Sequence, residues 1–309
     1  MIYTLTLNTA IDMNIRCSGL APNTVNRTSH TEYSPNGKAI NVSIVLKRFS
    51  IASTAMGFFG GFSGKYIFDE MIKRDITTKP CWVDDMTRIN VFINDGKDEY
   101  KLVGKGPFIP EDKKTEMLQQ LESLTDCTHL VISGSLPNNV EPEFYTHILT
   151  LCERKKIEVI LDISHPKLQE LLAYKPLLIK PNDDEVKEIF GLETKTEEQI
   201  LFALQQIHAQ GARNILLTLG DKGLYFSNGQ HVWFCNSVKI KLVSSACAGD
   251  AALAAFLSEW LSASTNQESI ELAIKKASAT GANVAESDGL GLLDKVTTYM
   301  HQLTVTQIK

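Results

Sequence analysis

Cysteine is scarce in this sequence, and no two of its six cysteines form a Cys-x-x-Cys pair. The histidines are also few and do not cluster beside them, so the spacing matches neither a zinc site nor a disulfide framework. We therefore interpret the cysteines as free thiols. They are Cys17, Cys81, Cys127, Cys152, Cys235 and Cys247.

The sequence also lacks long apolar runs and any excess of positive charge. No apolar run is long enough to cross a bilayer, and the start, MIYTLTLNTAIDMN, has no basic region followed by an apolar core. We therefore expect a cytoplasmic protein without a membrane partner. With 31 Lys and Arg against 36 Asp and Glu, the net charge is -5, which argues against nucleic acid as a partner. Any anionic ligand must be held by local positive charge.

Predicted strands and helices alternate from Pro110 onward, and this is typical of a parallel sheet covered by helices on both faces. With 309 residues, 43% of them hydrophobic, the chain is long enough to bury a large core. We predict an α/β fold with a mainly parallel sheet. The expected strands are 3–7, 52–57, 129–133, 159–162, 177–180 and 215–219, followed by a hairpin over 225–234. The expected helices include 111–121, 141–155, 166–173, 182–190, 196–208, 251–262, 268–283 and 290–301.

A second, smaller sheet is predicted outside the main one. Residues 87–93 and 99–103 flank the turn Asn94-Asp95-Gly96-Lys97, which is the pattern of a β-hairpin. Because an isolated hairpin is only marginally stable, it must pack against the alternating segments that precede it. We therefore expect a single domain over 1–309, with a small β-sheet lid formed by about 13–33 and 86–104.

The segment 242–260, LVSSACAGDAALAAFLSEW, carries the most informative motif. Its small-residue turn places Asp250 at the start of a run rich in Ala, Leu and Phe, which predicts a buried helix. The first N–H groups of a helix lack internal partners and, with the helix dipole, form an anion site suited to a phosphoryl group. Asp is also favoured there simply as a helix cap. A cap does not require the small residues Ala248 and Gly249, which allow close approach of a ligand.

Two further polar positions follow predicted strands or begin helices. Asp12 lies just after the first predicted strand, at the edge of the sheet where ligands bind in α/β folds. It is a candidate for holding sugar hydroxyls, although a solvated loop aspartate has the same sequence pattern. The turn Asn36-Gly37-Lys38 begins a predicted helix and places Lys38 and Asn41 about one turn apart. It does not match a Walker A loop.

Taken together, these stretches resemble the ribokinase-like (PfkB) carbohydrate kinases, in particular their hexose-phosphate branch, which contains 1-phosphofructokinase and tagatose-6-phosphate kinase. The resemblance spans nearly the whole chain. Its motifs are Leu7-Asn8-Thr9-Ala10-Ile11-Asp12, Val25-Asn26-Arg27, Asn36-Gly37-Lys38-Ala39-Ile40-Asn41-Val42, Thr87-Arg88-Ile89-Asn90-Val91, Gly134-Ser135-Leu136-Pro137, Lys180-Pro181-Asn182-Asp183-Asp184-Glu185 and Cys247-Ala248-Gly249-Asp250.

The resemblance implies ATP-dependent phosphoryl transfer to a hydroxyl of a ketohexose monophosphate, giving a bisphosphate. Fructose 1-phosphate, tagatose 6-phosphate and fructose 6-phosphate are the implied substrates, ATP and Mg²⁺ the cofactors, and a homodimer through the lid the assembly. Asp250 looks like the catalytic base. The turn Cys247, Ala248 and Gly249, with the N–H of Asp250, looks like the anion hole. Such a role for a weak base is reasonable, because a loose phosphoryl transition state needs little early deprotonation.

The same resemblance implies three sets of binding residues. The sugar phosphate is assigned to Asp12, Arg27, Gly37, Lys38, Asn41, Arg88 and Ser135. ATP is assigned to Lys180, Asn182, Thr218, Gly220, Gly223 and Asn283. Mg²⁺ is assigned, through water, to Asn182 and Glu185. The cations are the kind of residue that a phosphate needs in an acidic protein, because an arginine binds it through two charge-assisted hydrogen bonds.

The sequence departs from the family pattern at several positions. Asn36 and Ala39 stand where glycine is usual, Thr9 where proline is usual, and both Cys247 and His165 again where glycine is usual. If position 247 requires a positive φ, cysteine there is strained. These differences keep two alternatives open: a kinase of an unphosphorylated sugar or nucleoside, and a non-catalytic regulator that binds a nucleotide or a sugar phosphate.

Overall fold

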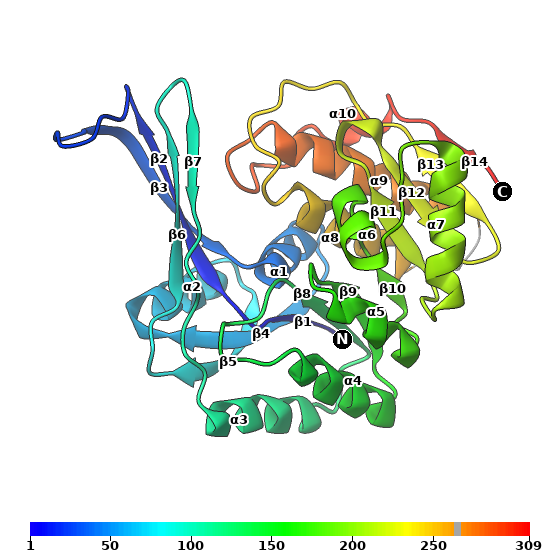
Figure 1. Ribbon diagram of the computed structural model, residues 1–309, viewed down its shortest axis with the longest axis horizontal. Coiled ribbons are helices and arrows are strands. Elements are labelled where there is room, and N and C mark those ends of the chain that lie inside the picture. Colours follow the sequence, from blue (N-terminus) through cyan, green and yellow to red (C-terminus); the bar gives the residue numbers. More distant parts are fainter. Residues whose placement is uncertain (263–266) are drawn as a thin grey trace.

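The computed structural model describes residues 1–262 and 267–309 (Figure 1). Within them, a ten-stranded sheet has the order β14-β13-β12-β11-β10-β9-β8-β1-β4-β5. The strands from β11 to β5 are parallel, whereas β12, β13 and β14 are antiparallel to their neighbours. Their bounds are β1 Ile2–Thr6, β4 Ser53–Gly60, β5 Thr77–Val83, β8 His129–Ser133, β9 Glu158–Asp162, β10 Leu178–Ile179, β11 Ile215–Thr218, β12 Leu224–Ser227, β13 Val232–Cys235 and β14 Val305–Gln307.

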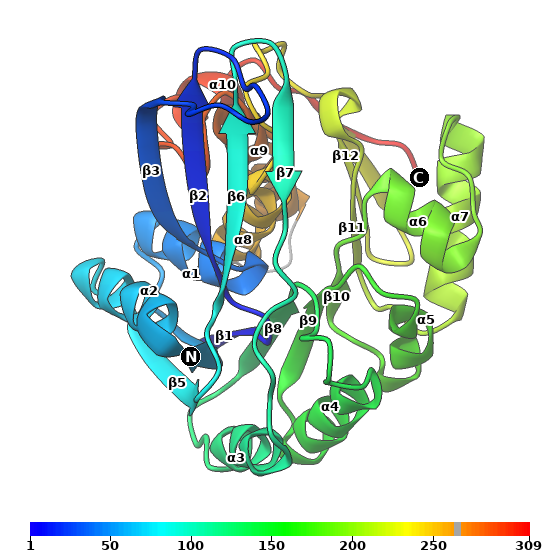
Figure 2. The same cartoon turned by 60° about the vertical axis from the view of Figure 1, so that its left-hand side comes forward.

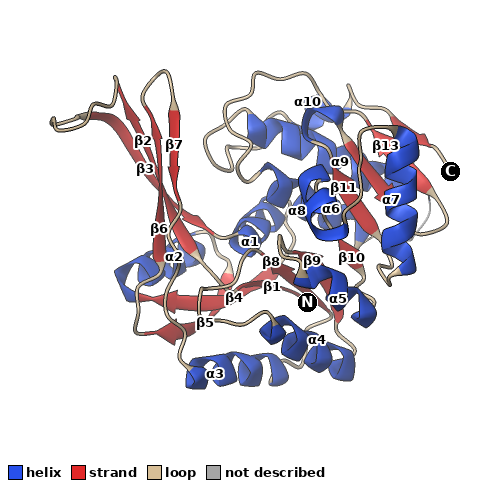
Figure 3. Ribbon diagram, in the orientation of Figure 1, coloured by secondary structure: helices blue, strands red, loops and turns tan. Residues whose placement is uncertain are grey.

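Helices cover both faces of this sheet, as the alternation in the sequence predicts (Figure 3). One core lies against α3 to α7 and includes Leu5 and Leu130, and the other lies against α1, α8 and α9 and includes Val131 and Ile160. Neighbouring residues of β8 enter opposite cores because successive side chains of a strand point to opposite faces. The bounds are α1 Lys38–Arg48, α2 Gly61–Lys73, α3 Glu111–Glu122, α4 Glu143–Lys155, α5 Lys167–Leu171, α6 Asp183–Phe190, α7 Glu197–Ala209, α8 Ala248–Trp260, α9 Gln267–Ala285 and α10 Val296–Met300.

A separate four-stranded sheet projects from the main body, as Figures 1 and 2 show. Its strands are β2 Ala10–Cys17, β3 Thr28–Asn36, β6 Arg88–Asn94 and β7 Glu99–Leu102, in the order β3-β2-β6-β7. The pair β2–β6 is parallel and the other two pairs are antiparallel. The predicted fold class, an α/β main sheet with an additional small sheet, is therefore confirmed.

Some sequence-based predictions of elements were wrong or incomplete. The helix expected over 290–301 is only the five-residue α10, because Gly289, Gly291 and Leu293 adopt positive φ values of 65°, 52° and 59° and keep the preceding chain out of a helix. The edge strands β5 and β14 were not predicted. In the two described segments, no helix has the length and apolar character that crossing a membrane requires.

Candidate active site

The candidate site lies where the amino ends of α1 and α8 meet the carboxyl ends of the parallel strands. Asp250 stands in the first turn of α8, which begins at Ala248, three residues earlier than predicted. Its side chain is nearly buried, with 7% of the residue exposed, and its Oδ2 accepts a hydrogen bond from Asn41 Nδ2 at 2.8 Å. Burial, and next the charge of Asp162, raise the pKa of Asp250 to about 7. A carboxylate with such a pKa is suited to accept a proton near neutral pH.

Backbone N–H groups at the start of α8 are available beside Asp250. The first bond inside the helix runs from Ala251 N to Cys247 O at 2.9 Å, and Ala248 N donates to Ser245 O at 3.4 Å. The N–H groups of the next two residues, Gly249 and Asp250, donate to no acceptor in the described chain. The ammonium of Lys180 lies against Gly249. This end of α8 therefore presents unpaired donors and positive charge together, as an anion site requires.

Cys247 adopts the left-handed conformation, with φ 63° and ψ -10°. Position 247 therefore does require a positive φ, a conformation that favours glycine. Placing cysteine there strains the backbone by about 1–2 kcal/mol. Its Sγ lies 3.3 Å from Asn41 Nδ2. Burial, and next the charges of Asp250 and Asp12, raise the pKa of the thiol well above its usual value, so the group stays protonated.

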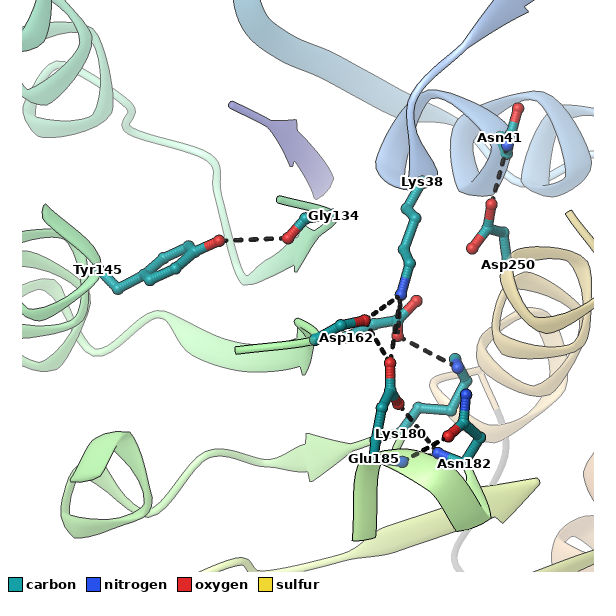
Figure 4. Close-up of polar contacts among 10 residues, drawn as sticks. Lys38, Asn41, Gly134, Tyr145, Asp162, Lys180, Asn182, Glu185 and Asp250 are labelled. Atoms are coloured by element: carbon teal, nitrogen blue, oxygen red, sulfur yellow. Dashed lines mark hydrogen bonds and ion pairs between the residues drawn. The ribbon is translucent and has the colours of Figure 1, made fainter. Parts of the chain in front are cut away.

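A buried carboxylate that sequence reasoning missed lies at the centre of the site. Asp162, at the end of β9, has its Oδ1 3.3 Å from Lys38 Nζ and 3.1 Å from Lys180 Nζ (Figure 4). Burial acts to raise the pKa of Asp162, but the two ammonium groups lower it below its usual value. The sequence feature that could have identified Asp162 is its position at the end of a buried strand. The same kind of position identified Asp12 as a candidate. Lys38 and Lys180 come from distant parts of the chain and share this carboxylate, while Lys38 Nζ also lies 3.7 Å from Glu185 Oε1.

The residues proposed for Mg²⁺ form a helix cap. Asn182 Oδ1 accepts from Glu185 N at 2.7 Å, and Glu185 Oε2 accepts from Asn182 N at 3.0 Å, a reciprocal capping box at the start of α6. Across residues 1–262 and 267–309, no group of three or more His, Cys, Asp or Glu is arranged to hold a metal ion. Asp162 Oδ2, however, is buried without a hydrogen-bond partner there. This sparse set of oxygens fits a Mg²⁺ that keeps most of its water ligands.

Asp12 and Arg88 lie together on the inner side of the small sheet, near β1. Asp12 is 6% exposed and accepts hydrogen bonds from Asn90 Nδ2, at 2.8 Å, and from Asn36 Nδ2. Burial is the main cause that raises its pKa. The Arg88 guanidinium donates to Gly104 O and Asn8 O, both at 3.1 Å, while its buried Nε has no partner within the described chain. An arginine with an unused buried donor is well placed to bind a further acceptor.

Of the other sugar-side residues, Gly37 and Ser135 lie at the site, but Arg27 does not. Gly37 has φ 129° and precedes α1, and a Cβ there would lie 2.6 Å from Thr6 Cγ2. Ser135 is exposed near Asn8, whose Nδ2 donates to Ser135 Oγ at 3.4 Å. Arg27 is exposed beyond the far end of the nine-residue β3, roughly 30 Å from Asn36 at about 3.3 Å per residue. Within one chain, Arg27 therefore cannot contact this site.

The residues proposed for ATP lie at or just after the ends of β10 and β11, except Asn283, which lies in α9. Thr218 forms an isolated parallel bridge with Asn182. Gly220 and Gly223 have φ values of 58° and 105° in the turn after β11, and a Cβ on Gly223 would collide with Cys235 O. Asn283 is buried in α9 and its Oδ1 accepts from Lys295 N at 2.8 Å, so its side chain fixes the segment that follows α9.

Comparison with known proteins gives consistent results at three levels. The family model "pfkB family carbohydrate kinase" matches residues 5–295. D-tagatose-1-phosphate kinase from Klebsiella oxytoca is 51% identical over 308 residues, covering 100% of both chains, and 1-phosphofructokinase from Bacillus subtilis (strain 168) is 35% identical over 309 residues with the same coverage. The crystal structure of phosphofructokinase-2 from Escherichia coli in complex with fructose-6-phosphate superposes with a TM-score of 0.86 at 24% identity, covering 97% of this chain and 99% of that one.

Proposed function

The chain belongs to the pfkB family of carbohydrate kinases, and from this premise we propose that it transfers the terminal phosphoryl group of ATP to a hydroxyl of a ketohexose monophosphate, giving a bisphosphate. The proposal treats residues 1–309 as one kinase domain in the cytoplasm, with the small sheet as its lid. The observation that carries it is Asp250, a buried carboxylate with a pKa of about 7 beside unpaired N–H groups of α8.

The residues of the site divide the work of phosphoryl transfer. Asp250 accepts the proton of the attacking hydroxyl, while the amino end of α8 and the ammonium of Lys180 bind the negative charge that develops on the transferred group. Asp162 holds Lys38 and Lys180 in place, because both ammonium groups contact its Oδ1. When bound with ATP near Asp162, Asn182 and Glu185, Mg²⁺ would neutralise phosphate charge.

Tagatose 1-phosphate is the first substrate to test, because the relative with 51% identity is named D-tagatose-1-phosphate kinase. It was absent from the substrates expected from the sequence. The decisive experiment measures ADP release with Mg-ATP and each of tagatose 1-phosphate, fructose 1-phosphate, tagatose 6-phosphate, fructose 6-phosphate, fructose and ribose. Selective turnover of one ketohexose phosphate supports the proposal. Preference for a free sugar would favour a kinase of unphosphorylated sugars, and calorimetric binding without ADP would favour a non-catalytic regulator.

Arg88→Ala is expected to raise the KM for the sugar phosphate roughly 10- to 100-fold with a smaller change in kcat, because a charge-assisted hydrogen bond contributes about 1.5–3 kcal/mol. The measurement is steady-state kinetics at constant Mg-ATP. Arg154→Ala is the control, since Arg154 is exposed and pairs with Glu122 on the outer surface. An unchanged apparent affinity for every phosphosugar would count against a phosphate-binding role and favour an unphosphorylated substrate.

We include a homodimer through the small sheet in this proposal. On the face opposite Asp12, beyond Ile11 and Ile89, which pack with α1 and α2, the strand register places Met13, Ile15, Tyr33, Val91, Ile93, Tyr100 and Leu102. Leu102 is 57% exposed and Tyr33 is 50% exposed. A continuous apolar face on a projecting sheet is typical of an interaction surface, and a second copy would cover it with the same face. In such a dimer, Arg27 of one chain would approach the site of the other chain.

Leu102→Asp is expected to convert the dimer to a monomer, because the new carboxylate would be buried without a partner in the interface. Sedimentation equilibrium measures the change. Leu272→Asp on α9 is the matched control, with the wild-type leucine 44% exposed and outside the small sheet. A wild-type protein that sediments as a monomer at micromolar concentration would contradict the proposed interface.

A further inference from the structure

Asn36 connects the two carboxylates on either side of the site through a continuous chain of side-chain hydrogen bonds. Its Nδ2 donates to Asp12 Oδ2, and its Oδ1 accepts from Asn41 Nδ2 at 2.7 Å. Asn41 Nδ2 also donates to Asp250 Oδ2 at 2.8 Å. The order Asp12, Asn36, Asn41, Asp250 therefore joins the sugar-side carboxylate to the base. The sequence placed Asn36 in the turn before a predicted helix and marked it as a departure from a usual glycine, but it assigned no role to its side chain.

The direction of each bond in this chain is determined by its two ends. An ionised carboxylate only accepts hydrogen bonds, so Asp12 and Asp250 must each face an N–H group. Asn36 consequently turns Nδ2 to Asp12 and Oδ1 to Asn41, and the N–H of Gly37 reinforces this by donating to the same Oδ1 at 2.5 Å. Asn41 then uses its two amide hydrogens on Asn36 and Asp250. Neither amide can flip without bringing two acceptors together.

We propose that Asn36 is a positioning residue that couples sugar binding at Asp12 to the orientation of the base Asp250. The inference rests on the proposed function, because it assigns those two roles. Without the Asn36 side chain, Asn41 loses the acceptor for one of its amide hydrogens and is free to rotate away from Asp250. Asp12 at the same time loses one of its two amide donors. A hydroxyl bound by Asp12 and the base that deprotonates it then no longer share a rigid frame.

Charged groups near Asp12 and Asp250 also influence the titration of these two carboxylates. Asp250 is faced by Asp162 from β9, Lys38 from α1 and Lys180 from the end of β10, and by the thiol of Cys247, the residue that precedes α8. Asp12 is faced by Arg88 from β6 and by the same thiol. None of these groups is altered by replacing Asn36, so a change in the titration of Asp250 reports the amide chain itself.

The test compares Asn36→Ala and Asn36→Asp with the wild type in steady-state kinetics across pH. Asn36 lies in the extended strand β3, so alanine is compatible with its backbone. Asn36→Ala is expected to lower kcat roughly 10-fold and to move the acidic limb of the kcat profile upward by about half a pH unit, because losing a donor raises the pKa of a carboxylate. Asn36→Asp keeps an acceptor for Asn41 but places a second negative charge beside Asp12. The decrease in kcat should therefore be larger than for Asn36→Ala at pH 8 and become smaller as the pH falls.

Asn14→Ala is the matched control: Asn14 lies on the same side of β2 as Asp12, and within the described chain its side chain forms no hydrogen bond. A purely packing role for Asn36 would give equal losses for alanine and aspartate and an unmoved pH profile, which would overturn the inference. A readout independent of turnover is the ¹³C titration of the Asp250 carboxylate, assigned by its absence in Asp250→Asn. Its midpoint should rise in Asn36→Ala and not in Asn14→Ala. An inactive wild type would refute the proposed function, while this titration would still decide the role of Asn36.

Discussion

Replacing Asp250 with asparagine is expected to lower kcat roughly a thousand-fold while ATP still binds, because general base catalysis by a positioned carboxylate contributes about 10²- to 10⁴-fold. Asparagine has the same shape and retains the amino end of α8, but it cannot accept the proton of the sugar hydroxyl. The measurements are single-turnover ADP formation and calorimetric titration with Mg-ATP. The control is Asp112→Asn in the exposed first turn of α3. Near-wild-type activity of Asp250→Asn would remove Asp250 as the base.

The same substitution is expected to stabilise the fold at neutral pH. The pKa of Asp250 is raised from 3.8 to about 7 in the folded protein, so the folded state binds this proton more tightly than the unfolded state. Stability therefore falls as pH rises from about 4 to about 7, and the ionised carboxylate remains a cost above that range. Asp250→Asn removes this cost and should raise the free energy of unfolding by about 4 kcal/mol at pH 8, with little difference near pH 4. If Asp250→Asn were less stable than the wild type at pH 8, the conclusion that burial destabilises the ionised carboxylate would be wrong.

Asp162→Asn is expected to lower the free energy of unfolding by about 3–5 kcal/mol at pH 7, because buried Lys180 loses its ion-pair partner and Lys38 keeps only the longer contact with Glu185. Turnover should fall with it, since both ammonium groups lose the acceptor that positions them. Because the pKa of Asp162 is lowered in the folded state, its contribution to stability is fully present above the unfolded pKa of about 4 and is lost below it. Urea unfolding from pH 5 to 8 should therefore show a nearly constant deficit.

Glu158→Gln is the matched control for Asp162→Asn, because Glu158 lies at the other end of the same strand and pairs with Arg213 on the surface. An exposed pair of this kind contributes about 0–1 kcal/mol. Adding Lys180→Met to Asp162→Asn should restore part of the lost stability, since one uncompensated charge is removed. Equal, small losses for Asp162→Asn and Glu158→Gln would show that the central carboxylate does not compensate the two lysines.

The sequence by itself determined the features that depend on local pattern. The alternation of apolar strands and amphipathic helices predicted the main sheet, since strand and helix periods differ over a few residues. The small residues before Asp250 predicted a helix start with open N–H groups, and the Asn-Gly-Lys turn predicted the start of α1. The family resemblance added the expected roles. Local conflicts such as the positive φ values near Gly289 and Leu293 escaped this reasoning, because an apolar run with glycine fits several conformations.

Only the tertiary structure decided which of these side chains meet. Asp162, Lys38 and Lys180 converge because strand order brings β9 and β10 beside the start of α1, a relation that no local pattern contains. The chain of amides through Asn36 likewise needs the register of β2 against β3. Arg27 resembles a phosphate ligand in the sequence but lies beyond the far end of β3. The pKa of Asp250 depends on burial by distant segments, and desolvation is a property of the packed site, not of the residues that precede it along the chain.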